Sequence, residues 1–268
     1  MDTLEGISSL LDKSLLQREE GSEGEPRFVM LETIRVYAQE RFEESEEVEE
    51  VSRLHAEYFV ALAEKAEPVL WGAEDAAWFQ RLEAEYGNLR AALSWSLGGA
   101  DIELGLRLAG ALGEFWHARG YYEEGKRWLE RALAKDVRIS AAAYPKALEA
   151  LGWLANEMGD MEGAEEAAKK GLKLGNLVGI ESIRKASFLR ILGATARIRG
   201  DHEHAEELYE ESLALSREAG DMRGIAHALI TLGWAASTRG DTSTRRYSMR
   251  RVWSWPGSWA ARNRSAIP

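Results

Sequence analysis

The sequence contains no cysteine in its 268 residues, which excludes a disulfide framework and zinc sites built on thiolates. It has only 5 prolines, whereas leucine, alanine and glutamate are abundant and 45% of residues are hydrophobic, a composition that favours helices. We find neither a signal peptide nor an apolar run of about 18 residues, so we expect no membrane span and a cytoplasmic location. The phosphate-binding pattern G-x-x-x-x-G-K followed by serine or threonine is also absent.

Negative charge dominates most of the chain, and the formal net charge is −11. Residues 241–268 hold six arginines and one acid, which leaves 28 basic and 44 acidic residues in 1–240. The acidic segment 1–240 would repel a phosphate backbone, so we expect no direct nucleic-acid binding. Because 241–268 lacks a helical pattern where a helix is due, we expect a frame-shifted or disordered tail. The alternative is a tail that binds RNA or an anionic membrane.

A leucine-glycine pair recurs along the second half of the chain, and another glycine follows each pair after seven residues. The pairs begin at Leu112, Leu151, Leu192 and Leu232, and the closing glycines are Gly120, Gly159, Gly200 and Gly240. A fixed period of about 40 residues is typical of stacked helical hairpins, each unable to bury its apolar face alone. Glycine lowers helix stability by about 1 kcal/mol, so its recurrence inside the first helix of each pair indicates a steric requirement.

Each of the first three closing glycines is followed at fixed distances by a small residue and by a leucine. The small residues are Gly125, Ala164 and Ala205, and the leucines are Leu133, Leu172 and Leu213. This pattern resembles tetratricopeptide repeats lengthened from about 34 residues to about 40. The resemblance implies an all-α solenoid of antiparallel helix pairs. We expect such repeats in 105–240, after a helical connector with degenerate repeats in 49–104.

The first 48 residues predict a different module. A short helix over 4–12 is followed by a β-hairpin at about 14–31 and by a helix from Glu32. The segments Leu10-Leu11-Asp12-Lys13-Ser14-Leu15-Leu16 and Arg27-Phe28-Val29-Met30-Leu31-Glu32-Thr33-Ile34-Arg35-Val36-Tyr37-Ala38 resemble the winged-helix end of bacterial STAND-class regulators, which are signalling ATPases related to AfsR- and LuxR-type transcriptional regulators.

That resemblance implies the order ATPase, winged helix and repeats. We therefore interpret 1–48 as a partial winged-helix module and expect an ATPase domain upstream that is missing from this chain. ATP would bind in that domain only, and we expect no cofactor in 1–268.

The spacing of the leucine-glycine pairs places a set of polar and aromatic residues on the face of the first helices opposite the second helices. We predict that this face is a partner-binding groove with ten candidate residues: Arg107, Glu114, His117, Glu149, Trp153, Asn156, Arg190, Arg197, His227 and Trp234. Trp153 and Trp234 occupy equivalent positions. Both tryptophans could pack between repeats, or both could anchor a partner, as tryptophan often does at interfaces.

Nothing in the sequence predicts catalysis or a metal site. The close histidines His202 and His204 point apart at this helical spacing, so we expect them to be solvated rather than metal ligands. No nucleophile elbow is present, and a choice among the many carboxylates would be arbitrary. Residues 1–30 carry three basic and seven acidic side chains, which argues against DNA contact by the hairpin.

The sequence therefore predicts the non-catalytic sensor or regulatory region of a STAND-type ATPase or transcriptional regulator. Its expected partners are a protein, a peptide or a small inducer in the repeat groove, together with the ATPase domain. The alternative is a free-standing tetratricopeptide scaffold for protein interactions.

Overall fold

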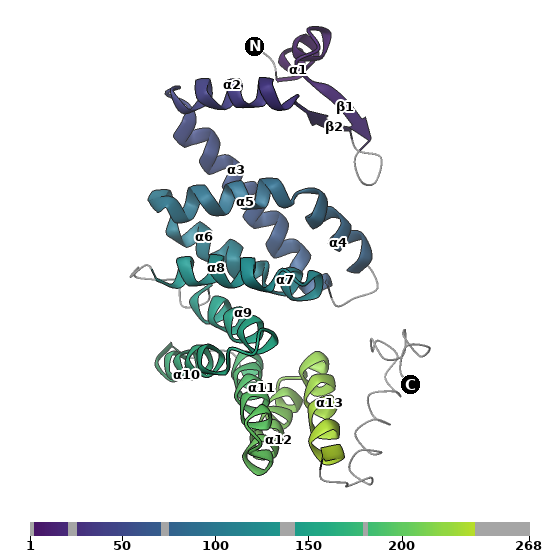
Figure 1. The fold of residues 1–268 in the computed structure, drawn as a ribbon, viewed down its shortest axis with the longest axis vertical. Helices are drawn as coiled ribbons and strands as arrows, with labels where there is room; N and C mark the ends of the chain where they lie inside the picture. The colour runs from purple at the N-terminus through teal and green to yellow at the C-terminus, as the bar shows by residue number, and fades with distance from the viewer. Residues whose placement is uncertain (1–2, 21–25, 71–74, 135–142, 179–181, 239–268) are drawn as a thin grey trace.

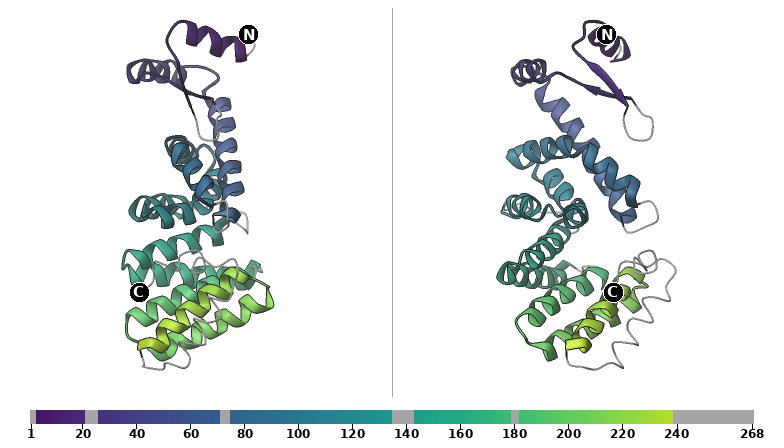
Figure 2. Two further views of the ribbon diagram at one scale, coloured as in Figure 1. Left: turned by 90° about the vertical axis from the view of Figure 1, so that its right-hand side faces the viewer. Right: turned by 45° about the vertical axis from the view of Figure 1, so that its right-hand side comes forward.

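The computed structural model describes residues 3–20, 26–70, 75–134, 143–178 and 182–238. In these ranges the chain is helical apart from one two-stranded sheet, which confirms the predicted all-α class with a single hairpin. The helices form an elongated stack, with α1 and the hairpin at one end and α12 and α13 at the other (Figures 1 and 2). None of the helices in the described ranges has the length and apolar character that a membrane span requires.

The N-terminal module consists of α1, the hairpin β1–β2 and α2. Their bounds are α1 Thr3–Asp12, β1 Gln17–Glu20, β2 Pro26–Val29 and α2 Glu32–Glu43. The strands are antiparallel, and Gln17 lies opposite Val29. The predicted strand start at Ser14 is wrong, because Ser14 has a φ of 58° and the N–H of Leu15 donates to Leu10 O at 2.9 Å. Those residues close α1, and the strand begins only after them.

The remaining helices form two layers. The first-helix layer comprises α3, α6 with its continuation α7, α9, α11 and α13, and the second-helix layer comprises α5, α8, α10 and α12. Their bounds are α3 Val48–Ala66, α5 Tyr86–Trp95, α6 Ile102–Ala111, α7 Gly113–Arg119, α8 Tyr122–Leu133, α9 Ala143–Glu157, α10 Met161–Val178, α11 Ser182–Ile198, α12 His202–Glu218 and α13 Met222–Thr238.

One further helix, α4 Asp75–Ala84, lies between α3 and α5 in the chain. The break between α4 and α5 falls at Glu85, and α5 includes Gly87. The pair α3 and α5 precedes the regular hairpins in the same two layers, and α3 packs on α6 as α6 packs on α9.

The glycine that ends each first helix and the residue after it fix the local geometry of the hairpins. Gly120, Gly159 and Gly200 have φ values of 75°, 76° and 87°, a left-handed conformation that suits glycine. Asp160 Oδ1 then accepts from the N–H of Gly163 at 2.9 Å, and Asp201 caps α12 in the same way. A Gly-Asp dipeptide therefore ends one helix and starts the next. Gly240 lies outside the described residues.

The glycines of the leucine-glycine pairs stand where two helices approach closely. A Cβ on Gly113 would lie 2.5 Å from Ala150 Cβ of α9, and one on Gly193 would lie 2.5 Å from Tyr209 Cε1 of α12. These separations are too short for two carbon atoms, so the predicted steric requirement is confirmed at both positions.

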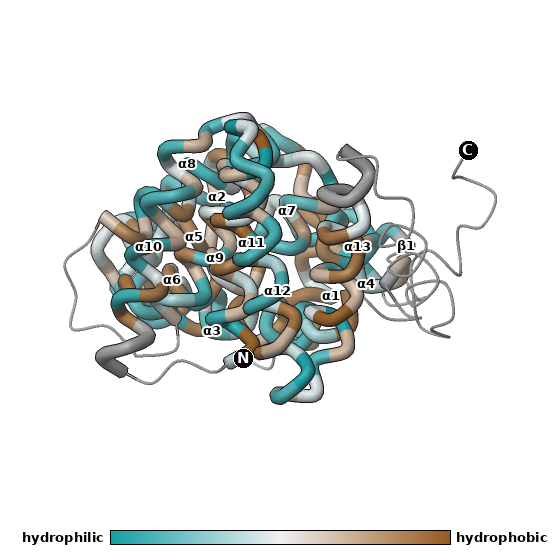
Figure 3. The backbone as a smooth tube through the Cα atoms, turned by 90° about the horizontal axis from the view of Figure 1, so that it is seen from below, coloured by the Kyte–Doolittle hydropathy of each residue, from teal (hydrophilic) through white to brown (hydrophobic). Residues whose placement is uncertain are grey.

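The apolar core runs through both layers. Phe115 and Trp116 of α7 are fully buried, and Trp116 Nε1 donates to Tyr86 OH of α5 at 2.8 Å. Viewed along the long axis, much of α13 is drawn as hydrophobic (Figure 3), and its residues Leu229 and Leu232 are 4% and 7% exposed. The N-terminal module differs, because α2 has no buried residue and Tyr37 is 63% exposed.

Candidate functional site

Carboxylates and basic side chains link consecutive members of the first-helix layer. Arg107 of α6 donates from Nε and Nη2 to Glu64 of α3 at 2.8 and 2.7 Å, and the hydrogen bond from Arg107 holds the pKa of Glu64 below its ordinary value. Lys146 of α9 pairs with Glu67, just after α3. Arg184 of α11 pairs with Glu149 of α9 at 2.5 Å. The candidates Arg107 and Glu149 are thus engaged between helices.

Trp153 and Asn156 connect α9 to α11. Trp153 is half-buried, and its Nε1 donates to Ser187 Oγ at 3.1 Å. Asn156 Nδ2 donates to Ile191 O at 3.2 Å, and the hydroxyl of Thr195 donates to Asn156 Oδ1 at 3.1 Å. These are contacts that packing between repeats provides. The role of Trp153 as an anchor for a partner stays a prediction.

His117 and Glu114 lie on α7, near the end of α9. His117 Nε2 is 3.3 Å from Glu157 Oε1, and His117 Nδ1 is 3.9 Å from Glu114 Oε1. The imidazole therefore lies between a carboxylate of its own helix and one of the next first helix.

Arg190 is the most deeply placed charged side chain of the ten candidates that the structure describes, with 5% of its surface exposed. Its Nη1 donates a long hydrogen bond of 3.4 Å to Ser212 Oγ of α12, and its Nε has no hydrogen-bond partner. Its Cζ lies 5.9 Å from the centre of the Trp153 ring. Burial lowers the pKa of Arg190 to about 10, so the guanidinium is still charged at neutral pH.

His227 of α13 shares the surroundings of Arg190. Its pKa is lowered to about 3, chiefly by burial and to a smaller extent by its neighbours Arg190, Arg223 and His117. The imidazole is therefore neutral at neutral pH. Since α7, α11 and α13 each contribute one of His117, Arg190 and His227, the structure brings three of the predicted residues into one electrostatic environment.

The last two candidates lie toward the ends of α11 and α13. Arg197 is half-buried, and its Nε lacks a hydrogen-bond partner. Burial raises the pKa of Tyr209, and Arg197 opposes that rise, so the two side chains lie close together. The side chain of Trp234 lies outside the described residues.

The sequence analysis missed four residues around Arg190, namely Arg184, Ser187, Ser212 and Arg223. Ser187 could have been found, because it stands six residues before Gly193, as Arg107 stands before Gly113 and His227 before Gly233. Ser212 lies on the second helix of its pair, and no spacing in the sequence indicates that it reaches Arg190.

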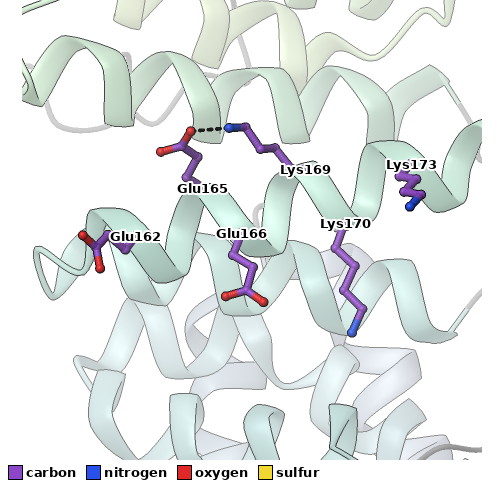
Figure 4. Close-up of a pocket in the computed structure, with 6 residues that line it drawn as sticks. All are labelled: Glu162, Glu165, Glu166, Lys169, Lys170 and Lys173. Carbon is purple, nitrogen blue, oxygen red and sulfur yellow. Dashed lines mark hydrogen bonds and ion pairs between the residues drawn. The ribbon is translucent and has the colours of Figure 1, made fainter.

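A shallow hollow on α10 is the other candidate surface. It is lined by six charged residues of that one helix (Figure 4): Glu162, Glu165, Glu166, Lys169, Lys170 and Lys173. Glu165 binds Lys169 at 2.5 Å and also pairs with Arg199, as expected for a solvated helix face. In the described part of the chain, no three histidine, aspartate or glutamate side chains are grouped as a metal site.

Comparisons with known proteins match both parts of the chain. The tetratricopeptide repeat family matches residues 184–244, and the winged helix-turn-helix domain family matches residues 2–43. A candidate HTH-type transcriptional regulator of Mycobacterium tuberculosis, Rv0890c, is 28% identical over 253 residues, which are 91% of this chain. Its counterpart in Mycobacterium bovis has the same identity and coverage. The chain spans 28% of the length of these curated relatives.

Two further proteins are similar to this chain. Tetratricopeptide repeat protein 29 of Trypanosoma brucei brucei is 29% identical over 120 residues, 44% of this chain and 25% of that protein. The crystal structure of BtubC from P. vanneervenii has a TM-score of 0.51 and 19% identity, and it covers 81% of this chain and 90% of that one. This last likeness concerns the fold alone.

Two features therefore characterise the chain. It carries tetratricopeptide-like helical repeats behind a segment similar to winged helix-turn-helix domains, and it is homologous to candidate HTH-type transcriptional regulators.

Proposed function

We propose that this chain is the ligand- or protein-binding sensor region of a longer signalling ATPase of the STAND class or of an AfsR- or LuxR-type transcriptional regulator. The order of its parts supports this proposal most strongly. A winged helix-turn-helix match precedes tetratricopeptide repeats, and the similarity to the mycobacterial regulators extends over 91% of this chain but 28% of theirs. Tetratricopeptide repeats generally mediate protein interactions, which suits a sensor role.

The proposal assigns neither catalysis nor DNA binding to this chain. The hairpin offers little to a phosphate backbone, because Arg27 Nη1 is bound to Glu85 Oε1 at 3.1 Å. Glu19 and Glu20 stand on β1 beside Arg18, which adds negative charge to the same strand. DNA contact in the longer protein would then belong to a segment outside residues 1–268.

The exposed apolar side chains of the N-terminal module support a contact with the ATPase domain. Leu31, Val36 and Tyr37 are 50%, 48% and 63% exposed, and α2 carries two of them. An isolated hairpin is marginally stable in water, so this module gains from a surface that covers it. In the proposed mechanism, ligand binding to the repeats shifts the population of two states because the ligand binds them with unequal affinity.

The coding sequence upstream of residue 1 tests the proposal. We expect the same reading frame to continue upstream through a nucleotide-binding segment that includes G-x-x-x-x-G-K followed by serine or threonine. A stop codon upstream with no such segment in frame would contradict the ATPase proposal.

That contrary result would favour the second candidate, a free-standing scaffold for protein interactions. The similarity over 44% of this chain to a protein named tetratricopeptide repeat protein 29 supports the scaffold.

A further inference from the structure

Arg190 is the most deeply buried basic side chain that the structure describes in the first-helix layer. Arg107, Lys146 and Arg184 each pair with a carboxylate of a neighbouring element. Arg190 is 5% exposed, and among the residues that the structure describes no carboxylate pairs with its guanidinium. Its Nε also lacks a hydrogen-bond partner. The layer thus contains a buried cation that has no paired carboxylate and one unpartnered N–H group among the described residues.

A bound anion would stabilise a buried guanidinium that has no paired carboxylate. Removal of a charge from water is costly unless ion pairing and hydrogen bonds replace the lost hydration. The hydrogen bond to the neutral Ser212 hydroxyl is long, at 3.4 Å, and replaces little of it. The edge formed by Nε and one Nη is planar, and its two N–H groups match the two oxygens of a carboxylate.

The charges around Arg190 favour a single negative charge on the ligand. The guanidinium of Arg190 is attracted electrostatically by Glu149 and Asp221 and repelled by Arg223. The carboxylate of Glu149 is already bound to Arg184 at 2.5 Å. This group contains one more basic than acidic side chain, an excess that one carboxylate would neutralise. Its members are Arg184, Arg190 and Arg223 on the basic side, and Glu149 and Asp221 on the acidic side. A phosphate dianion would exceed this excess of positive charge.

Trp153 gives this site an aromatic wall. Its ring centre lies 5.9 Å from Arg190 Cζ, and the hydrogen bond from Trp153 Nε1 to Ser187 Oγ fixes the indole. The neutral imidazole of His227 belongs to the same surroundings and adds no charge to them. Four helices, α9, α11, α12 and α13, thus contribute groups around one guanidinium.

We propose that Arg190 anchors a carboxylate-binding site where α9, α11 and α13 meet. That this carboxylate belongs to the ligand of a sensor region rests on the function proposed above. A free organic acid and the C-terminal carboxylate of a peptide share this chemistry, and the experiment distinguishes them.

The test measures the thermal unfolding midpoint of the full 268-residue chain against increasing acetate or succinate, with sodium chloride added to keep ionic strength constant. A ligand that binds only the folded state raises the midpoint as its concentration rises. We expect this rise in the wild type, and a loss of affinity by about ten- to hundredfold in Arg190→Leu, since charge-assisted hydrogen bonds disappear. Arg199→Leu, directly after the end of the same helix, removes a guanidinium that pairs with Glu165, and should keep the wild-type response.

The midpoint without added carboxylate separates a binding role from a structural one. Replacement of a buried, unpaired charge by an apolar side chain should leave the midpoint of Arg190→Leu equal to or above that of the wild type. A clear fall would assign Arg190 a structural role and overturn the proposal. Arg190→Lys keeps the charge without the planar edge, and should keep the fold and lose most of the response to carboxylate.

Two short peptides, one with a free C-terminus and one amidated, identify the source of the carboxylate. A rise with the free peptide and not with acetate or succinate assigns the site to a peptide C-terminus, whereas a rise with the small acids assigns it to a free acid. An equal rise in Arg190→Leu, a stronger response to inorganic phosphate, or no response to any carboxylate would overturn the proposal. None of these outcomes changes the upstream reading frame, so the two proposals fail separately.

Discussion

Single glycines determine how closely the helices of this stack approach one another. Gly113 lies against Ala150 of the next first helix, and Gly193 lies against the ring of Tyr209. A leucine-glycine pair inside a helix is therefore explained by the helix opposite it rather than by the flexibility of glycine. The addition of one methyl group to such a glycine tests this explanation directly.

Gly113→Ala should destabilise the fold by about 1 to 3 kcal/mol, because its Cβ would lie 2.5 Å from Ala150 Cβ and force α7 and α9 apart. Gly87→Ala is the matched control, since nothing lies within 4 Å of the added methyl group and the residue is exposed on α5. That control should change stability by a few tenths to about 1 kcal/mol in the stabilising direction. Urea unfolding of both variants measures the difference, and equal destabilisation would contradict the steric explanation.

His227 should make stability depend on pH. Its pKa falls from 6.5 to about 3 in the folded chain, chiefly through burial, so between these values the unfolded chain binds a proton that the folded chain does not. The free energy of unfolding should therefore decrease as the pH is lowered from 6.5 toward 3, by at most about 1.4 kcal/mol per pH unit. Above pH 6.5 this contribution has no pH dependence.

His227→Gln removes this titrating group and should make the dependence less steep between pH 6.5 and pH 3, as measured by urea unfolding at several pH values. The exposed residue His204 supplies the control variant His204→Gln. A pH dependence that is unchanged in His227→Gln would show that another group is responsible.

At the scale of the element, hydrogen bonds between neighbouring residues fix where a helix begins. Asp160 caps α10 by accepting from the N–H of Gly163, and it binds Lys126 of α8 as well. The hydrogen bond from Lys126 and that from Gly163 hold the pKa of Asp160 below its ordinary value. One side chain therefore starts α10 and ties it to α8.

Asp160→Ala should lower the free energy of unfolding by about 1 to 2 kcal/mol, through the loss of the cap and of the ion pair. Asp160→Asn keeps an oxygen that can accept from Gly163, so it should lose less than half as much. Urea unfolding at neutral pH compares the two variants. An equal loss in both would assign the effect to Lys126 rather than to the cap.

The N-terminal elements should open more easily than the repeats. No residue of α2 is buried, whereas α11 buries residues such as Phe188 and Ile191 completely. Amide hydrogen exchange should therefore be faster in β1, β2 and α2 than in α11, because local opening exposes little apolar surface there. Comparable protection of α2 and α11 in the isolated chain would contradict this account of the module.

Elements defined by neighbouring residues were predictable, and contacts between distant helices were not. The closing glycines Gly159 and Gly200 marked the ends of α9 and α11, because a left-handed glycine acts within a few residues of the helix end. The start of β1 was missed, since Ser14 adopts a positive φ that the sequence does not indicate.

The candidate site shows the same division. Spacing placed Arg107 and Arg190 on first helices, as the structure does. Spacing could not show that Glu64 of α3 pairs with Arg107, nor that Arg190 lacks such a partner, because both depend on which helix packs next to which.

At the scale of the whole molecule, the stack connects an exposed N-terminal module to a layer of first helices that contains the candidate binding site. The chain spans 28% of the length of its mycobacterial relatives, and Tyr37 of α2 is 63% exposed. The central claim is that this module contacts a nucleotide-binding segment of a longer protein and that the repeats sense the ligand.

Calorimetric titration of the separately produced upstream nucleotide-binding segment into this chain tests that claim most directly. We predict saturable binding that Tyr37→Glu weakens by about tenfold or more, because a charge would enter an apolar contact. Tyr58→Glu on α3, where Tyr58 is 57% exposed, should bind as the wild type does. No binding, or equal weakening by the two substitutions, would contradict the claim.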